Sequence, residues 1–82
     1  MSVESAAVSI LRRIWMGVSK GNVTLVNGNL PSEVAAYLQN RKRKELAELE
    51  SRYGVIIVLR GDPALAPGAG KLDFVKDEMS LH

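Results

Sequence analysis

The densest group of side chains that could do chemistry is the cationic run Arg41-Lys42-Arg43-Lys44, to which Arg12 and Arg13 add two further cations. Closely spaced cations neutralise phosphates, so this set is a candidate for salt-dependent, sequence-independent contact with RNA. A solvated helix face explains the run equally, because Arg41 with Glu45 and Lys44 with Glu48 have the four-residue spacing of helical ion pairs. Both interpretations of the run stay open.

Groups that could support catalysis or bind a metal ion are scarce. The single histidine, His82, is the last residue, so the folded body cannot build a histidine triad or a histidine metal cluster. Asp73 and Asp77 fall on a predicted strand and tail, where a spacing of four does not define a metal site. The glycines between residues 61 and 70 do not open a helix as phosphate-binding loops do, and are turn glycines. We therefore assign no catalytic, cofactor-binding or metal-binding residue.

Trp15 is the most informative apolar residue. It lies about 100° around a predicted helix from Ile14, at the margin of the apolar stripe. A tryptophan in this position either completes the core or anchors a contact with another subunit. We name Trp15, Leu11 and Tyr37 as candidate interface residues. The aromatic residues are isolated from one another, so the sequence offers little support for stacking of single-stranded bases.

The first element that must position these groups is a helix from Glu4 to Val18. Its apolar residues recur at steps of three and four, the period of one buried helical face: Ala7, Ile10, Leu11, Ile14 and Val18. Ser2 is placed to cap it, and Gly17 and Gly21 mark its end. A strand is expected from Val23 to Val26, closed by a turn at residues 27–29, Asn-Gly-Asn.

A second helix is predicted to begin at Pro31 and to end at Gly54. Lys42 falls in a gap of its apolar stripe, so either the lysine stem lies along the edge of the core or the helix bends near Gln39-Asn40. The stripe consists of Val34, Ala35, Leu38, Leu46, Leu49 and Tyr53.

Two more strands complete the expected fold. Val55 to Leu59 is an uninterrupted apolar run typical of the centre of a sheet, and Lys71 to Lys76 alternates as a half-exposed strand does. The order helix-strand-helix-strand-strand predicts an α+β (two-layer α/β) fold, with a three-stranded mixed sheet and helices on one face. The first two strands should run parallel with a right-handed connection, and the last two should form an antiparallel hairpin. The spatial order of the strands cannot be read from the sequence.

Composition sets the outer bounds. The chain has 82 residues, 46% hydrophobic, with a net charge of +2 and no cysteine. We expect one small domain over residues 1–76, a frayed tail over 77–82, no disulfide, no membrane span and no signal peptide. A soluble cytoplasmic protein is the expectation, and its small core would gain stability from a partner.

Three stretches carry a family resemblance: Ser2 to Ile14, Pro31 to Arg43, and Leu46 to Val55, followed by Asp62-Pro63. Together they resemble the C-terminal small domain of the bacterial ribonuclease E/G family. The resemblance spans roughly Ser2 to Phe74. Its most specific part is Pro-x-Glu-Val-Ala-x-Tyr-Leu, beginning at Pro31, with the basic helix that follows.

The resemblance implies a non-catalytic part of a magnesium-dependent endoribonuclease that acts in RNA processing. In the family, the catalytic aspartates, the magnesium ion and the main RNA-binding surfaces lie upstream. A Cys-Pro-x-Cys zinc link immediately precedes the serine that Ser2 resembles. No cofactor is therefore expected on this chain. The implied role is subunit assembly by self-association beside the parent's upstream catalytic domain. An auxiliary RNA-binding module acting through Arg41 to Lys44 is the alternative, and no membrane partner is expected.

Overall fold

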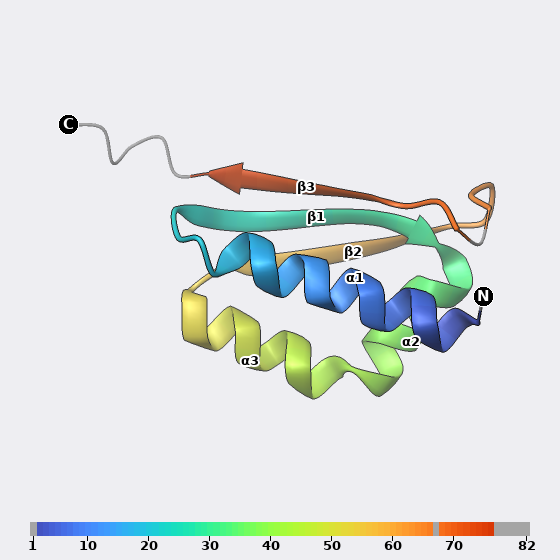
Figure 1. Cartoon of the computed structure of the whole chain (residues 1–82), viewed down its shortest axis with the longest axis horizontal. Coiled ribbons are helices and arrows are strands. Elements are labelled where there is room, and N and C mark those ends of the chain that lie inside the picture. Colours follow the sequence, from blue (N-terminus) through green and yellow to red (C-terminus); the bar gives the residue numbers. More distant parts are fainter. Residues whose placement is uncertain (1, 67, 77–82) are drawn as a thin grey trace.

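The computed structural model describes residues 2–66 and 68–76, which form one layer of helices against one layer of sheet (Figure 1). The helices lie on one face of the sheet, and the α+β class with a mixed three-stranded sheet is confirmed. The expected tail over residues 77–82, with Asp77 and His82, lies outside the described residues. In chain order the elements are α1 Val3–Val18, β1 Val23–Pro31, α2 Ser32–Arg41, α3 Arg43–Tyr53, β2 Ile56–Asp62 and β3 Lys71–Lys76.

Helix α1 begins as its sequence predicts. The Ser2 hydroxyl accepts a hydrogen bond from the Ser5 backbone N–H at 3.1 Å, which satisfies one of the free amides of the first turn. The helix ends at Val18, between the two glycines expected to mark its end. Gly21 has a φ of 84°, a conformation that favours glycine.

Strand β1 is longer than expected, and the predicted turn at residues 27–29 is wrong. The strand continues through Asn27, Gly28 and Asn29 to Pro31. A side chain at Gly28 would meet Leu59 Cδ2 at 2.7 Å, so the glycine makes room for its neighbour on the helix side of the sheet. The two asparagines alternate onto the open face, where polar side chains meet water. These residues therefore extend the strand rather than close it.

The sheet order is β2-β1-β3, which corrects two expectations. β1 pairs parallel with β2, as predicted, but β3 pairs antiparallel with β1 and forms no hairpin with β2. β1 is thus the central strand, and the apolar run in β2 lies at an edge. Helices cover only one face of the sheet, so Ile56 at the start of β2 is 61% exposed. The continuous apolar run of β2 therefore belongs to an edge strand and not to the central strand of the sheet.

The predicted second helix is two helices that meet at Lys42. This residue has φ −118° and ψ 23°, closes α2 and opens α3. The break falls after the Gln39-Asn40 position considered from the sequence. Pro31 is the cap of α2 rather than its first residue, and Gly54 ends α3 with a left-handed φ of 65°. The gap in the apolar stripe at Lys42 therefore marks a change of helix axis.

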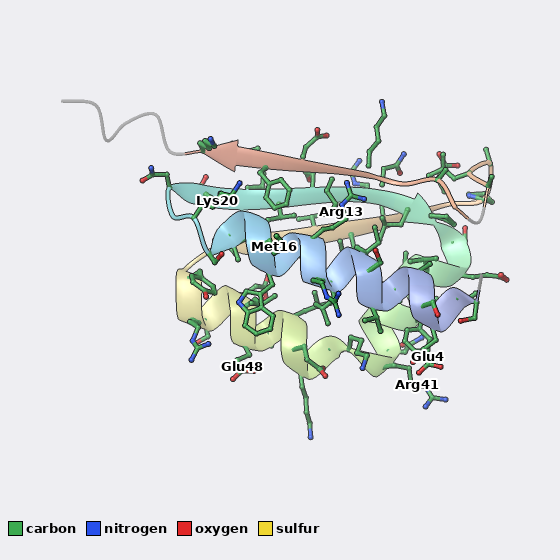
Figure 2. All side chains as sticks on the ribbon, viewed as in Figure 1. Glu4, Arg13, Met16, Lys20, Arg41 and Glu48 are labelled. Carbon is green, nitrogen blue, oxygen red and sulfur yellow. The ribbon has the colours of Figure 1, made fainter. Side chains whose placement is uncertain are left out.

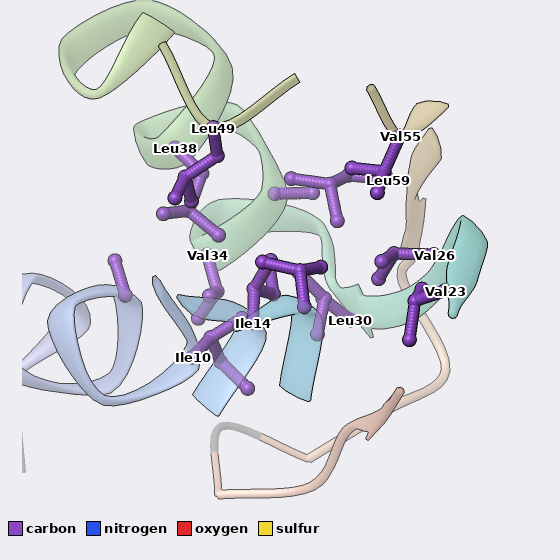
Figure 3. Packing of buried hydrophobic residues seen from close by; sticks show 13 residues of the cluster. Ile10, Ile14, Val23, Val26, Leu30, Val34, Leu38, Leu49, Val55 and Leu59 are labelled. Atoms are coloured by element: carbon purple, nitrogen blue, oxygen red, sulfur yellow. The ribbon is translucent and has the colours of Figure 1, made fainter. Parts of the chain in front are cut away.

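The core lies between the helices and the inner face of the sheet (Figure 3). Ile14 of α1, Leu30 of β1 and Leu38 of α2 are among its largest fully buried side chains. No helix in the described part of the chain is long and apolar enough to cross a membrane. The buried residues of this hydrophobic cluster are Ala7, Ile10, Ile14, Val18, Val23, Val26, Leu30, Val34, Ala35, Leu38, Leu49, Val55 and Leu59.

Candidate functional site

One flank of α1 carries an apolar seam, Val8, Leu11 and Trp15, that is only partly covered by the chain itself. The spacing of three and four residues places these side chains on one side of the helix, beside the buried face. Trp15 is 52% exposed and Val8 is 37% exposed, whereas Leu11 packs partly against the core. The seam therefore joins one side chain that packs against the core, Leu11, to two that are exposed to solvent, Val8 and Trp15.

Helix α3 forms the other wall of a shallow groove along this seam. Leu11 and Trp15 line it from α1, and the cavity has a volume of about 120 Å³. The α3 side contributes the buried Leu49 and the exposed charged side chains Glu45, Glu48 and Arg52. An apolar floor with a charged rim has the chemistry of a protein contact surface.

The third candidate interface residue, Tyr37, does not belong to this groove. It is half-buried on α2 and packs against the hydrophobic core. The structure thus brings Trp15 and Leu11 together but leaves Tyr37 outside the groove that they line.

The six candidate RNA-contact cations do not form one surface. Arg41, Arg43 and Lys44 are exposed around the α2–α3 junction, while Lys42 is half-buried there. Lys42 Nζ lies 3.9 Å from Glu45 Oε2, a pair at a spacing of three residues. Within the described ranges, neither of the predicted pairs at a spacing of four forms an ion pair. The break at Lys42 separates Arg41 from Glu45, whereas Lys44 and Glu48 lie in the same helix, α3, and still form no pair.

The two arginines of α1 occupy different surroundings. Arg12 lies with Glu4 in a depression formed by α1 residues alone. Arg13 faces a separate groove towards β3, with Lys20 and Lys76. Figure 2 shows Arg13 and Arg41 on opposite sides of α1. Arg13 and Arg41, one from each part of the predicted RNA-contact set, are therefore separate in space.

The α1–β3 groove is a feature that sequence reasoning missed. It is lined by Arg13, Met16 and Gly17 of α1, by Lys20 in the turn after that helix, and by Phe74 and Lys76 of β3. Lys76 is far from the arginines in sequence. Only the antiparallel placement of β3 on the α1 side of the sheet brings the three cations together.

Metal binding has no support in residues 2–66 and 68–76, where no group of three histidine, cysteine or acidic residues is arranged to hold an ion. The chain also contains no cysteine. The magnesium and zinc that the family resemblance implies therefore have no fitting ligand set on these residues.

Comparison with known proteins assigns this small two-layer α+β domain to a family. The family model described as "RNase E/G, Thioredoxin-like domain" matches residues 1–74. The chain therefore belongs to the thioredoxin-like domains of the ribonuclease E/G family.

A curated relative agrees with this assignment. The chain is 36% identical over 62 residues to the protein named Ribonuclease E from Haemophilus influenzae. The match covers 76% of this chain and 7% of the relative, so the chain corresponds to a small part of that protein's length.

Proposed function

We propose that this domain serves subunit assembly in a ribonuclease E/G-type endoribonuclease. It takes no catalytic role and acts beside the parent's magnesium-dependent catalytic domain, in the cytoplasm. The Val8-Leu11-Trp15 seam carries the proposal, because it leaves a half-exposed tryptophan beside a shallow groove. The family match supports the placement of this domain in a ribonuclease E/G-type protein. The proposed partner is a second copy of the chain.

The geometry of the seam suits a helix as its partner. Apolar residues at i, i+3 and i+7 form the stripe through which one helix packs on another. Helix α1 already uses its neighbouring face for Ile10, Ile14 and Val18, so the seam widens the apolar surface from the core towards solvent. A helix from a second subunit would cover Trp15 and continue the core outward.

The free energy gained by burying Trp15 alone does not stabilise a dimer. An aromatic side chain buries about 150–250 Å² on full burial, so covering the exposed half of Trp15 removes about 100 Å² from water. At about 25 cal/mol per Å² this contributes about 2–3 kcal/mol. Association costs about 4 kcal/mol or more in lost translational and rotational freedom. Trp15 therefore needs Leu11, Val8 and neighbouring contacts to form a stable interface.

The cationic run is a weaker basis for function. Arg41 to Lys44 spans a break between two helices, and its second member approaches Glu45. These features favour a solvated junction over an ordered track for phosphates. An auxiliary RNA-binding role for this run is the outcome that would replace the assembly proposal.

Sedimentation equilibrium of the purified chain over a wide concentration range tests the proposal, at low and high salt and with a short RNA. We expect a dimer or larger assembly that is insensitive to salt, and we expect Trp15→Gln to shift it towards monomer. Met16→Gln is the matched control, because Met16 is 61% exposed on the same helix but lies outside the seam groove. A wild-type chain that stays monomeric at high concentration would refute assembly. If that monomer shifted only with RNA, and neutralising Arg41 to Lys44 removed the shift, the auxiliary RNA-binding role would replace it.

A further inference from the structure

Phe74 packs against Gly17 at the base of the groove between α1 and β3. The Phe74 ring packs so closely on α1 that a Cβ at Gly17 would lie 2.8 Å from Phe74 Cδ2. A glycine in the last turn of α1 therefore lets the ring lie against the helix backbone. The resulting groove has a volume of about 430 Å³, with exposed Met16 on one wall.

The charge of the groove has a single sign. Arg13, Lys20 and Lys76 are all exposed, and among the described residues that line the groove none is acidic. The remaining charged residue of β3 near this end, Asp73, alternates onto the opposite face of the sheet from Phe74. Cations that lie close together attract a polyanion and release counterions on binding it.

The apolar groups decide which polyanion fits. Met16 is 61% exposed and Phe74 is half-buried, so the groove offers apolar contacts between its cations. A single nucleic-acid strand presents both phosphates and unstacked base faces, whereas a duplex hides its base faces. An acidic peptide supplies charge but lacks the planar apolar faces.

We propose that the α1–β3 groove binds a single strand of nucleic acid, with phosphates at Arg13, Lys20 and Lys76 and base faces against Met16 and Phe74. This site uses the flank of α1 opposite to the Leu11-Trp15 groove, so it does not depend on the assembly proposal. It is also separate from the Arg41 to Lys44 run.

Fluorescence anisotropy with a labelled single-stranded RNA oligonucleotide tests the site. Three phosphate contacts predict that affinity falls about 20-fold when monovalent salt rises from about 50 to about 200 mM. The variant R13Q/K20Q/K76Q should lose most of this dependence, lowering the log–log slope by about 2. The control R41Q/R43Q/K44Q removes the same charge from exposed side chains at the α2–α3 junction and should retain the slope.

Two further arms separate this site from general attraction. Met16→Ala should weaken RNA binding several-fold without changing the salt slope, because it removes an apolar contact and no charge. A glutamate-rich peptide and a blunt RNA duplex should each bind less tightly than the single strand at the same salt. Circular dichroism of each variant checks that the fold is retained.

The proposal would be overturned by no salt-dependent binding of the wild-type chain, by equal losses in the groove variant and the control, or by equal affinity for the acidic peptide. Tighter binding of the duplex would likewise reject a single strand as the occupant. Asp77 and Glu78 follow Lys76 in the sequence, outside the described residues. The experiment therefore uses the full chain, so that these acids are present in every variant.

Discussion

The Glu50 carboxylate of α3 accepts a hydrogen bond from the backbone N–H of Ile57 in β2, with an N–O distance of 2.9 Å. Two residues further along β2, the Leu59 carbonyl accepts a hydrogen bond at 3.0 Å from the side-chain amide of Gln39 in α2. β2 is an edge strand, and unpaired backbone groups at an edge are a template for pairing with other chains. Side chains from two helices therefore satisfy part of this edge.

Replacing Glu50 by alanine should lower the free energy of unfolding by about 1–2 kcal/mol, because the partly buried Ile57 N–H loses its acceptor. Glu50→Gln should recover most of the loss, since an amide oxygen also accepts. Urea unfolding followed by circular dichroism measures both. Glu48→Ala is the control on the same helix, at an exposed position. Equal effects at Glu48 and Glu50 would mean that the hydrogen bond contributes little.

Gly17→Ala should destabilise the domain by about 1–3 kcal/mol, because the new Cβ overlaps the Phe74 ring. Helix propensity alone predicts that the same substitution stabilises the domain, by about 1 kcal/mol for alanine over glycine. The sign of the change therefore shows which effect dominates.

A double-mutant cycle identifies the source of the Gly17→Ala effect. In a Phe74→Leu background the smaller side chain leaves room at residue 17, so the same substitution should become close to neutral. If Gly17→Ala remained equally destabilising beside leucine, the clash with the ring would be excluded as its cause.

Much of the fold follows from local pattern. The i, i+3, i+4 spacing of α1 and its Ser2 cap are local signals, and both appear as predicted. Strand order depends on which edges meet in space, and the apolar run of β2 misled the assignment of the central strand. Asn27-Gly28-Asn29 has turn-forming composition, yet Gly28 is demanded by the packing of Leu59, a contact distant in sequence. Tertiary packing decided both points.

In the candidate site, too, some features follow from local sequence pattern and others only from tertiary packing. Trp15 and Leu11 share a groove because helical spacing places them together, which the sequence contains. The cationic run looked continuous in sequence, but Lys42 changes the helix axis within it. The α1–β3 groove joins Arg13 to Lys76 through sheet pairing, and no local pattern records that proximity.

Adjacent residues on α1 should respond to substitution in opposite ways. Ile14 has no exposed surface, so Ile14→Ala should lower the free energy of unfolding by about 2–5 kcal/mol. Trp15→Gln should change it by about 1 kcal/mol or less in the monomer, because half of that side chain is already in water. Urea unfolding at low protein concentration measures both without a contribution from association. A loss at Trp15 as large as that at Ile14 would identify it as a core residue and weaken the assembly proposal.

The start of α1 depends on one hydroxyl. Ser2→Ala should destabilise the domain by about 1 kcal/mol, because the Ser5 backbone N–H loses the acceptor that it has at 3.1 Å. Ser2→Asp should retain stability, since a carboxylate accepts the same bond and favours the positive end of the helix dipole. Ser5→Ala is the matched control. It removes only the hydroxyl contact between the two serines and leaves the capped amide in place. Thermal unfolding of the three variants measures the order, and a Ser5→Ala loss equal to that of Ser2→Ala would assign the stability to the hydroxyl pair instead of the cap.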